Sequence, residues 1–232
     1  MLPPQDHAFF VSVHIPKTAG TTVATVLDRV YQRKVLFDYA PSESYNTPDP
    51  LIRQNANFIA SFFRGIHGHF GVTRHLPVFG GAKYISCVRH PVDRIISQYN
   101  HEYNDNGPGS YWHRPIRSGE MSVVDFAGLA GIGNAMTLHL AGLDLVDYDL
   151  LMITENIHAS FTLLNYVVGA MNIERYFGIP PNLPRSNEGT AREHQFEFPE
   201  AVKVEIYKRA QQDVELYRRA VEMFSAKARI YA

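Results

Sequence analysis

The stretch FFVSVHIPKTAGTTVATVLDRV (residues 9–30) changes from a strand pattern to a helix pattern within a few residues. A β-rich apolar run over residues 9–15 ends at Pro16, and apolar residues then recur at spacings of three and four over residues 23–30. Between them lies a short loop, residues 17–22, with one lysine, one glycine and three threonines. Strand, short loop and helix start in this order are typical of sites for phosphate-like groups, because N–H groups and the helix dipole favour an anion there.

This loop differs from the Walker A motif of ATPases, in which the lysine follows the glycines. Here the lysine comes first, so the pattern predicts an anion-binding loop but not an ATPase. The alternative is an ordinary turn in which Thr21 or Thr22 caps the helix. The candidate anion-binding residues are Lys17, Thr18, Ala19, Gly20, Thr21 and Thr22.

Length and composition indicate one α/β domain spanning residues 1–232. The chain has 232 residues, 45% of them hydrophobic, which is enough for a large core. A formal net charge of −1 gives no overall attraction to nucleic acid or to an acidic membrane. The single Cys87 excludes an internal disulfide, and no run is apolar enough for a signal or a spanning helix. We therefore expect a soluble, cytoplasmic protein with neither a nucleic-acid partner nor a membrane span.

Strand and helix patterns alternate along the rest of the chain. We expect further strands at 34–39, 82–88 and 149–154, helices at 89–103, 123–129, 134–140, 158–171 and 199–227, and loops at 41–56, 104–120 and 180–190. The apolar stripe of the last helix is expected to be a packing face. This alternation predicts a central, mostly parallel sheet flanked by helices, with ligands at the carboxyl ends of the strands.

A second constellation follows the strand at 82–88. Arg89 comes at the carboxyl end of that strand, and Ser97 falls in the second turn of the next helix. Because helical side chains lean toward the N-terminus, both residues could contact one anion. The alternative is that Arg89 pairs with an acid such as Asp93.

The third constellation is His67-Gly68-His69. In an extended segment, residues two apart point to the same face, so both rings would face one cleft. Histidine is the usual general base for a hydroxyl group. Two alternatives are a pair of structural histidines and an incomplete metal site. No acidic or cysteine partner is near in sequence, so we expect no metal.

Together these residues resemble the carbohydrate O-sulfotransferases that use 3′-phosphoadenosine 5′-phosphosulfate (PAPS), in particular the heparan sulfate and chondroitin/dermatan 2-O-sulfotransferases. The resemblance is carried by HIPKTAGTT (14–22) and VRHPVDRIISQY (88–99), with looser likeness at 134–142 and 217–224. It implies a P-loop-like fold, a 5′-phosphosulfate loop at Lys17, a 3′-phosphate site at Arg89 and Ser97, and a histidine base at His67 or His69. The chain lacks the membrane anchor and the disulfide pair of the Golgi enzymes, which suggests a bacterial-type soluble member. The loop with Arg185 and Ser186 stands, with a loose match, where the family has its C-terminal cofactor loop.

The resemblance implies in-line transfer of a sulfuryl group from PAPS to a hydroxyl of a saccharide or related acceptor, leaving 3′,5′-adenosine bisphosphate. Lys17 would stabilise the leaving phosphate, and the family match favours His69 over His67 as the base. No metal is implied. Two alternatives stay open. A kinase-like phosphotransferase would need a carboxylate pair for Mg²⁺, whereas Glu155 stands alone. A catalytically inactive nucleotide-binding module is the other.

The acceptor could be bound by aromatic and basic residues outside these motifs. An aromatic face beside cations suits a sugar, and an anionic one in particular. The alternative for the 104–120 loop is a lid with a buried tryptophan. Arg74 and His75, like Arg64, could extend a basic rim beside the histidines. The candidate acceptor residues are Arg64, Tyr111, Trp112 and Arg114, with His113 and Arg117 nearby.

Overall fold

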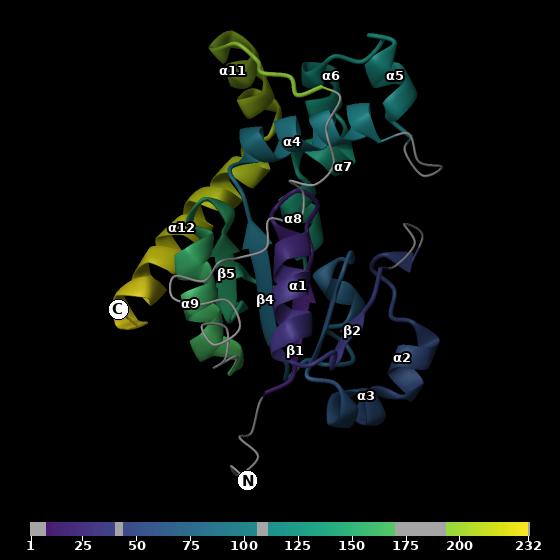
Figure 1. Ribbon diagram of the computed structural model, residues 1–232, viewed down its shortest axis with the longest axis vertical. Coiled ribbons are helices and arrows are strands. Elements are labelled where there is room, and N and C mark those ends of the chain that lie inside the picture. Colours follow the sequence, from purple (N-terminus) through teal and green to yellow (C-terminus); the bar gives the residue numbers. More distant parts are fainter. Residues whose placement is uncertain (1–7, 40–43, 106–110, 170–193, 232) are drawn as a thin grey trace.

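The computed structural model describes residues 8–39, 44–105, 111–169 and 194–231. Its centre is a five-stranded sheet in the order β2-β3-β1-β4-β5, in which every neighbouring pair is parallel (Figure 1). The predicted α/β fold with a parallel sheet and flanking helices is confirmed. The strands are β1 (Phe10–Val13), β2 (Val35–Phe37), β3 (Gly65–Gly68), β4 (Lys83–Val88) and β5 (Leu150–Ile153).

The sheet is buried on both faces, as a parallel sheet requires. Every residue of β1, β3 and β5 is buried, and in β1 and β5 this burial accounts for the mainly apolar sequence of the strand. Helices α9 (Ile157–Val168) and α12 (Gln211–Tyr231) pack against β5. Helix α1 (Gly20–Val30) lies in front of the sheet in Figure 1 and buries its apolar face, Val23, Val26, Leu27 and Val30.

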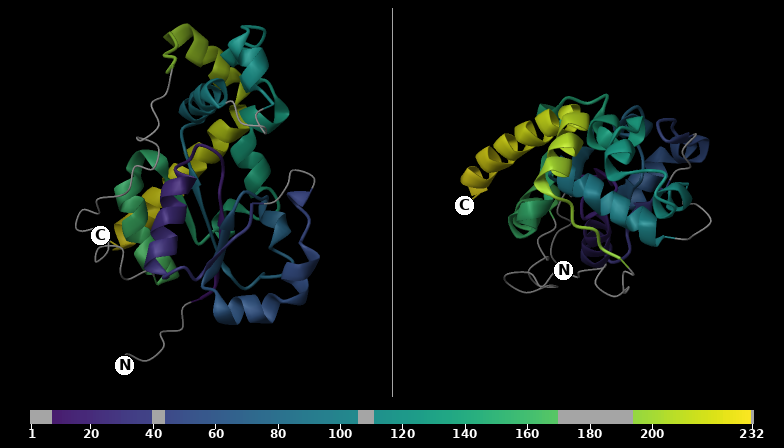
Figure 2. Two further views of the ribbon diagram at one scale, coloured as in Figure 1. Left: turned by 45° about the vertical axis from the view of Figure 1, so that its right-hand side comes forward. Right: turned by 90° about the horizontal axis from the view of Figure 1, so that it is seen from above.

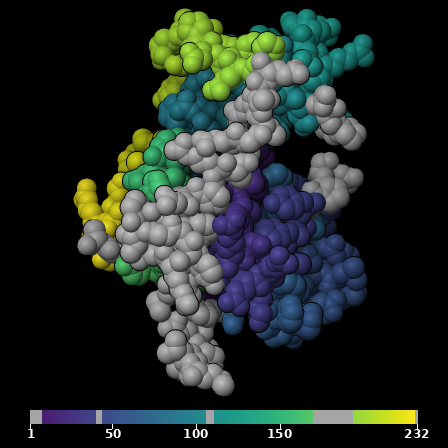
Figure 3. Space-filling view, viewed as in Figure 1, coloured from purple at the N-terminus to yellow at the C-terminus, as the bar shows by residue number. Residues whose placement is uncertain are grey.

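A second group of helices lies beyond the carboxyl ends of the strands, at the top of Figure 1 and of the left view of Figure 2. In the space-filling view these helices form the upper part of the molecule (Figure 3). They are α4 (Pro91–Asn104), α5 (His113–Arg117), α6 (Val123–Ala127), α7 (Ala130–Gly133) and α11 (Glu200–Arg209). They share a hydrophobic cluster of their own, made by Val92, Ile95, Tyr99, Ile116, Val123, Phe126, Ala127, Ile206 and Ala210.

A buried carboxylate joins the long helix α12 to α8 (Ala135–Leu140). Asp213, with 0% exposure, accepts hydrogen bonds from the N–H groups of Met136 (3.0 Å) and Thr137 (2.8 Å). These are first-turn N–H groups of α8, so Asp213 acts as a cap supplied from a distant helix. Nε of Arg94, on α4, lies 4.0 Å from Oδ2 of Asp213. This ion pair connects α4, which belongs to the second hydrophobic cluster, to α12.

Three predicted segments differ in detail. The expected loop 41–56 contains α2 (Pro50–Gln54) and the start of α3 (Ala56–Phe62), because Asp49 accepts the N–H groups of the first turn and Pro50 occupies the first helical position. The loop 104–120 contains the short helix α5. The C-terminal helix is two helices, α11 and α12, which separate at Ala210 because α11 packs into the second cluster while α12 packs on β5.

The other predicted elements are confirmed to within a few residues at their ends. Single 3₁₀ turns complete the description: η2 (Val72–Arg74), η3 (Leu145–Asp147) and η4 (Thr154–Asn156). No described helix combines the length and the apolar composition that crossing a bilayer requires. The predicted loop 180–190 and the last residues of the helix expected at 158–171 lie outside the described residues.

Candidate functional site

The loop between β1 and α1 has a strained main chain. Lys17 and Ala19 have φ angles of 67° and 66°, which residues other than glycine rarely adopt. Helix α1 then begins at Gly20, and no side chain caps its N-terminus. The alternative in which Thr21 or Thr22 caps this helix is therefore wrong. A helix start without a side-chain acceptor, at the carboxyl end of a parallel strand, is suited to binding an anion.

Gly20 is required because the ring of His14 lies against the start of α1. A Cβ atom at position 20 would come within 1.7 Å of Cδ2 and 1.9 Å of Nε2 of His14. No side chain fits there unless the imidazole moves. His14 therefore lies directly beside the anion-binding loop, a placement that the sequence pattern did not predict.

Arg89 reaches the same loop from the neighbouring strand. It follows β4, and its Nη1 donates a hydrogen bond to the main-chain oxygen of Lys17 at 3.3 Å. The described contacts of Asp93 include an ion pair with His90 Nδ1 at 3.7 Å and none with Arg89. The structure thus places Lys17 and Arg89 side by side at one edge of the sheet. Ser97 lies two turns into α4 and is half-buried, without a described contact to Arg89.

The two predicted histidines lie next to this loop. His67 is the third residue of β3, and His69 follows the strand. Both rings contact His14, with ring centroids 5.2 Å apart for His67 and 4.1 Å apart for His69, so they share a side as predicted. His67 is fully buried and its Nδ1 lies 2.9 Å from Ser12 Oγ, whereas His69 is half-buried.

The histidine cluster, defined as His14, His67 and His69, is held neutral. Burial, followed by the charges of neighbouring histidines, lowers the pKa of His14 to about 2 and that of His67 to about 3. Burial also lowers the pKa of His69. All three imidazoles are therefore neutral at neutral pH, but the strongly lowered pKa values make His14 and His67 weak proton acceptors.

An aromatic surface borders the histidine cluster. The ring of Tyr39 stands edge-on to His69 at 5.0 Å and is stacked with Phe37 at 6.4 Å. Tyr39 is 51% exposed and Phe37 41% exposed. Neither residue stands out in the sequence, because Phe37 belongs to the short edge strand β2 and Tyr39 follows it, so both fit an ordinary strand pattern.

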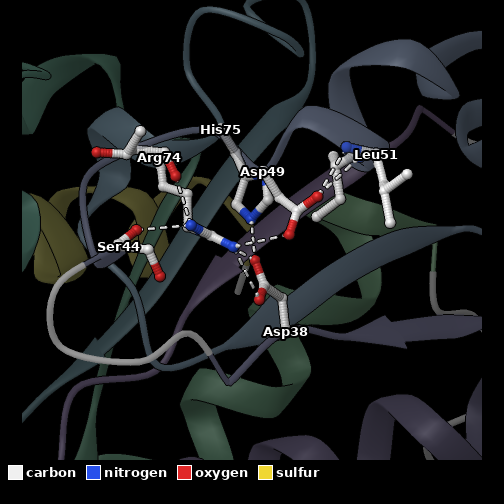
Figure 4. Close-up of polar contacts among 8 residues, drawn as sticks. Asp38, Ser44, Asp49, Leu51, Arg74 and His75 are labelled. Atoms are coloured by element: carbon white, nitrogen blue, oxygen red, sulfur yellow. Dashed lines mark hydrogen bonds and ion pairs between the residues drawn. The ribbon is translucent and has the colours of Figure 1, made fainter.

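Arg74 and His75 do not form a basic rim. Both are buried, and both bind Asp38: Arg74 Nε lies 2.7 Å from Asp38 Oδ2, and His75 Nε2 lies 2.9 Å from the same oxygen. Figure 4 shows the Arg74 guanidinium between this carboxylate and the main chain at Ser44, whose oxygen accepts a hydrogen bond at 2.6 Å. We name Arg74, His75 and Asp38 the arginine clamp.

Arg64 does not lie at the functional edge either. It precedes β3, and its main-chain oxygen accepts a hydrogen bond from Phe10, the first residue of β1. Parallel strands begin at one edge and end at the other, so Arg64 is at the amino edge, opposite Lys17. This position does not support the prediction that Arg64 contacts the acceptor.

The candidates on the 104–120 loop differ in what they can contact. Trp112 is half-buried and packs against the second hydrophobic cluster, with its ring centroid 6.3 Å from that of Phe126. Tyr111 is 87% exposed, and Arg114 is also exposed. Arg117 lies over the ring of Tyr103 at 5.1 Å. Arg185 and Ser186 lie outside the described residues.

Within the described part of the chain, no group of three or more His, Cys, Asp or Glu side chains is arranged to hold a metal ion. Glu155, which lacks the second carboxylate that a Mg²⁺ site would need, accepts a hydrogen bond from the main-chain N–H of His90 at 2.7 Å.

The Lys17 loop, Arg89 and the three histidines all lie in a segment that matches one protein-family model. Residues 4–125 match the model of the sulfotransferase family. The chain belongs to the sulfotransferase family. The fold has a solved counterpart, the mouse sulfotransferase SULT7A1 complexed with PAP, with a TM-score of 0.50, 13% identity and coverage of 98% of this chain and 90% of that chain. No curated protein matches the sequence. Membership of this family supports a role in sulfuryl transfer.

Proposed function

We propose that this sulfotransferase moves a sulfuryl group from PAPS to a hydroxyl group of a carbohydrate or related acceptor. The observation that carries the proposal is the contact between Arg89 and the Lys17 loop, with the histidine cluster beside it. A donor with one anionic group on each side of its ribose needs two cationic positions close together. The mouse structure of the same fold contains PAP, which supports this choice of donor.

The residues at the sheet edge fit such a donor. Lys17 and the uncapped first turn of α1 would hold the 5′-phosphosulfate, and Arg89 with Ser97 would hold the 3′-phosphate. When bound, PAPS supplies a sulfuryl group attached to a phosphate that is a good leaving group. Lys17 and the helix N–H groups stabilise the negative charge that collects on that phosphate.

His69 is the better candidate for the general base. His67 has 1% exposure and its Nδ1 is hydrogen-bonded to Ser12, so an acceptor hydroxyl has no access to its ring. The His69 ring is half-buried and so more accessible, and its buried Nε2, like that of His67, has no hydrogen-bond partner in the described structure. A buried ring nitrogen without a partner is costly, and an acceptor hydroxyl would provide one. His69 would take the proton of that hydroxyl as the new bond forms.

The saccharide acceptor rests on the 2-O-sulfotransferase resemblance and on the surface beside His69. Tyr39 and Phe37 present exposed aromatic faces at the histidine cluster, and flat apolar rings suit the faces of sugar rings. Tyr111 and Arg114 are further exposed candidates. We also propose that the chain acts as one catalytic domain, since α12 contacts both the sheet and α4.

A binding experiment tests the donor and a transfer experiment tests the acceptor. Calorimetric titration with 3′,5′-adenosine bisphosphate in the presence of EDTA should show saturable binding, and 5′-AMP should bind more weakly because it lacks the 3′-phosphate. A kinase-like enzyme would instead prefer ATP with Mg²⁺. Incubation with PAPS and a panel of saccharides, followed by mass spectrometry, should show addition of a single sulfate. Absence of bisphosphate binding would overturn the proposal.

A further inference from the structure

The turn that carries Arg89 is held on both sides by the segment after β5. On one side, Thr154 Oγ1 donates a hydrogen bond to the main-chain oxygen of Val88 at 2.9 Å. On the other, a carboxylate oxygen of Glu155 accepts the main-chain N–H of His90 at 2.7 Å. Arg89 is the residue between these two contacts. Its backbone is thus fixed to the neighbouring strand end rather than left as an open strand-to-helix connection.

A second contact fixes Glu155 itself. Its other oxygen, Oε2, accepts a hydrogen bond from the hydroxyl of Tyr217 on α12 at 3.0 Å. The Tyr217 ring also stands edge-on to the ring of His90, with centroids 5.6 Å apart. Glu155, Tyr217 and His90 therefore form a closed set of contacts, which we name the turn brace. It joins η4, α12 and the start of α4.

The charge of Glu155 makes this arrangement unexpected for a binding site. A carboxylate near a phosphate site repels the ligand, so electrostatics alone would disfavour an acid here. Both of its oxygens are used as hydrogen-bond acceptors in the turn brace. The geometry accounts for the acid: it orders the main chain that carries Arg89, and Arg89 in turn reaches Lys17.

We infer that Glu155 is a positioning residue for Arg89, which it holds in the direction of the Lys17 loop for the 3′-phosphate of the donor. This inference rests on the proposed function, because it assumes that Arg89 binds the donor. Tyr217 supports Glu155 in that role. The residue acts by accepting the His90 N–H, so a neutral acceptor of the same shape replaces it.

The test compares two substitutions that remove the same charge but differ in the acceptor. Glu155→Gln keeps an oxygen that can accept the His90 N–H, whereas Glu155→Ala does not. Asp147→Asn is the matched control, since Asp147 is an exposed acid in η3, before β5 and outside the turn brace, whose loss also removes one negative charge. Calorimetry with 3′,5′-adenosine bisphosphate should show an affinity roughly 2- to 10-fold weaker for Glu155→Ala. It should show no weakening for Glu155→Gln or Asp147→Asn.

Two further readouts separate positioning from general destabilisation. In the ligand-free protein, amide hydrogen exchange at His90 should become faster in Glu155→Ala and stay near the wild-type rate in Glu155→Gln. The affinity for 5′-AMP, which lacks the 3′-phosphate, should be the same in all variants. Tyr217→Phe should give a smaller loss of bisphosphate affinity in the same direction.

The outcomes distinguish the inference from the function beneath it. If wild-type protein does not bind the bisphosphate, the proposed function fails. If it binds and Glu155→Ala binds equally well, Glu155 does not position Arg89. Equal weakening by Glu155→Gln and Glu155→Ala would also overturn the inference, since the acceptor geometry would then not matter.

Discussion

The guanidinium of Arg89 donates a hydrogen bond to the main-chain oxygen of Lys17 at 3.3 Å, although the two residues are 72 positions apart in sequence. The contact follows from topology. Each residue comes just after a parallel strand, β1 or β4, and these strands are neighbours in the sheet. Parallel neighbours end at the same edge, so two separate cationic motifs meet there.

Substitution of Arg89 should weaken product binding more than it slows the chemical step. Arg89→Ala removes a charge-assisted contact, which corresponds to a loss of about 1.5–3 kcal/mol in the binding of 3′,5′-adenosine bisphosphate. Lys17→Ala should instead lower kcat about 10²- to 10³-fold, because Lys17 acts on charge that develops during transfer. Calorimetry and steady-state kinetics measure the two effects. The reverse ranking of the two variants would contradict these roles.

Loss of the general base should affect turnover and spare the donor site. His69→Ala should lower kcat about 10²- to 10⁴-fold with bisphosphate affinity nearly unchanged. His158→Ala, at an exposed position on α9, is the control and should keep full activity. His67→Ala should reduce activity less, since His67 is buried and bonded to Ser12. Full turnover of His69→Ala with a confirmed acceptor would remove His69 from the mechanism.

The sheet edge and its two motifs could be predicted because they depend on local patterns. Pro16 ends the first apolar run, and Pro91 begins the helix that follows the apolar run at 82–88. Because the strands are parallel, both runs end at the same edge of the sheet. The position of Arg64 could not be read in this way. It depends on β3 beginning at Gly65, and a strand of four residues separates Arg64 at one edge from His69 at the other.

Long-range partners account for the other differences. Arg74 and His75 read as exposed cations in the sequence, but Asp38, more than 30 positions away, draws both into the interior. The ring of His14 approaches Gly20, which is only six positions away, across the loop that joins β1 to α1. A single sequence pattern carries no signal for either contact, since each needs the tertiary arrangement before it exists.

The arginine clamp should contribute strongly to stability. Arg74 is 3% exposed and Asp38 13% exposed at their side chains, so removal of either partner leaves a largely buried charge. Arg74→Met should lower the free energy of unfolding by about 3 kcal/mol. Urea denaturation followed by circular dichroism at pH 7 measures the change. Arg218→Met is the control, because Arg218 is 56% exposed and bonded only to surface acids, and it should change stability by less than about 1 kcal/mol.

The arginine clamp should also make the free energy of unfolding depend on pH in the acid range. Burial would raise the pKa of Asp38, but hydrogen bonds from His75 and Arg74 lower it overall from 3.8. Its contribution is therefore present above pH 3.8 and is lost as the pH falls below that value toward the pKa of the folded state. In Arg74→Met this loss should be smaller. If the free energy of unfolding of that variant fell with decreasing pH as steeply as that of the wild type, Arg74 would not stabilise the ionised carboxylate.

Because of the histidine cluster, the free energy of unfolding should begin to fall at a higher pH than the arginine clamp alone would cause. Burial lowers the pKa of His14 from 6.5 to about 2 and that of His67 from 6.5 to about 3. Between these values and pH 6.5 the unfolded chain binds protons that the folded chain does not, so stability falls as the pH falls. Each such histidine contributes about 1.4 kcal/mol per pH unit in that range.

Urea denaturation at pH 5, 6, 7 and 8 tests this dependence in a range where Asp38 stays ionised. Wild-type stability should be nearly constant above pH 7 and fall steeply between pH 6 and pH 5. His67→Gln cannot titrate but can still bond to Ser12, so it should flatten the slope by about 1.4 kcal/mol per pH unit. His158→Gln, at an exposed site, should leave the slope unchanged. A wild-type slope that His67→Gln does not reduce would mean that His67 is not held neutral by burial in the fold.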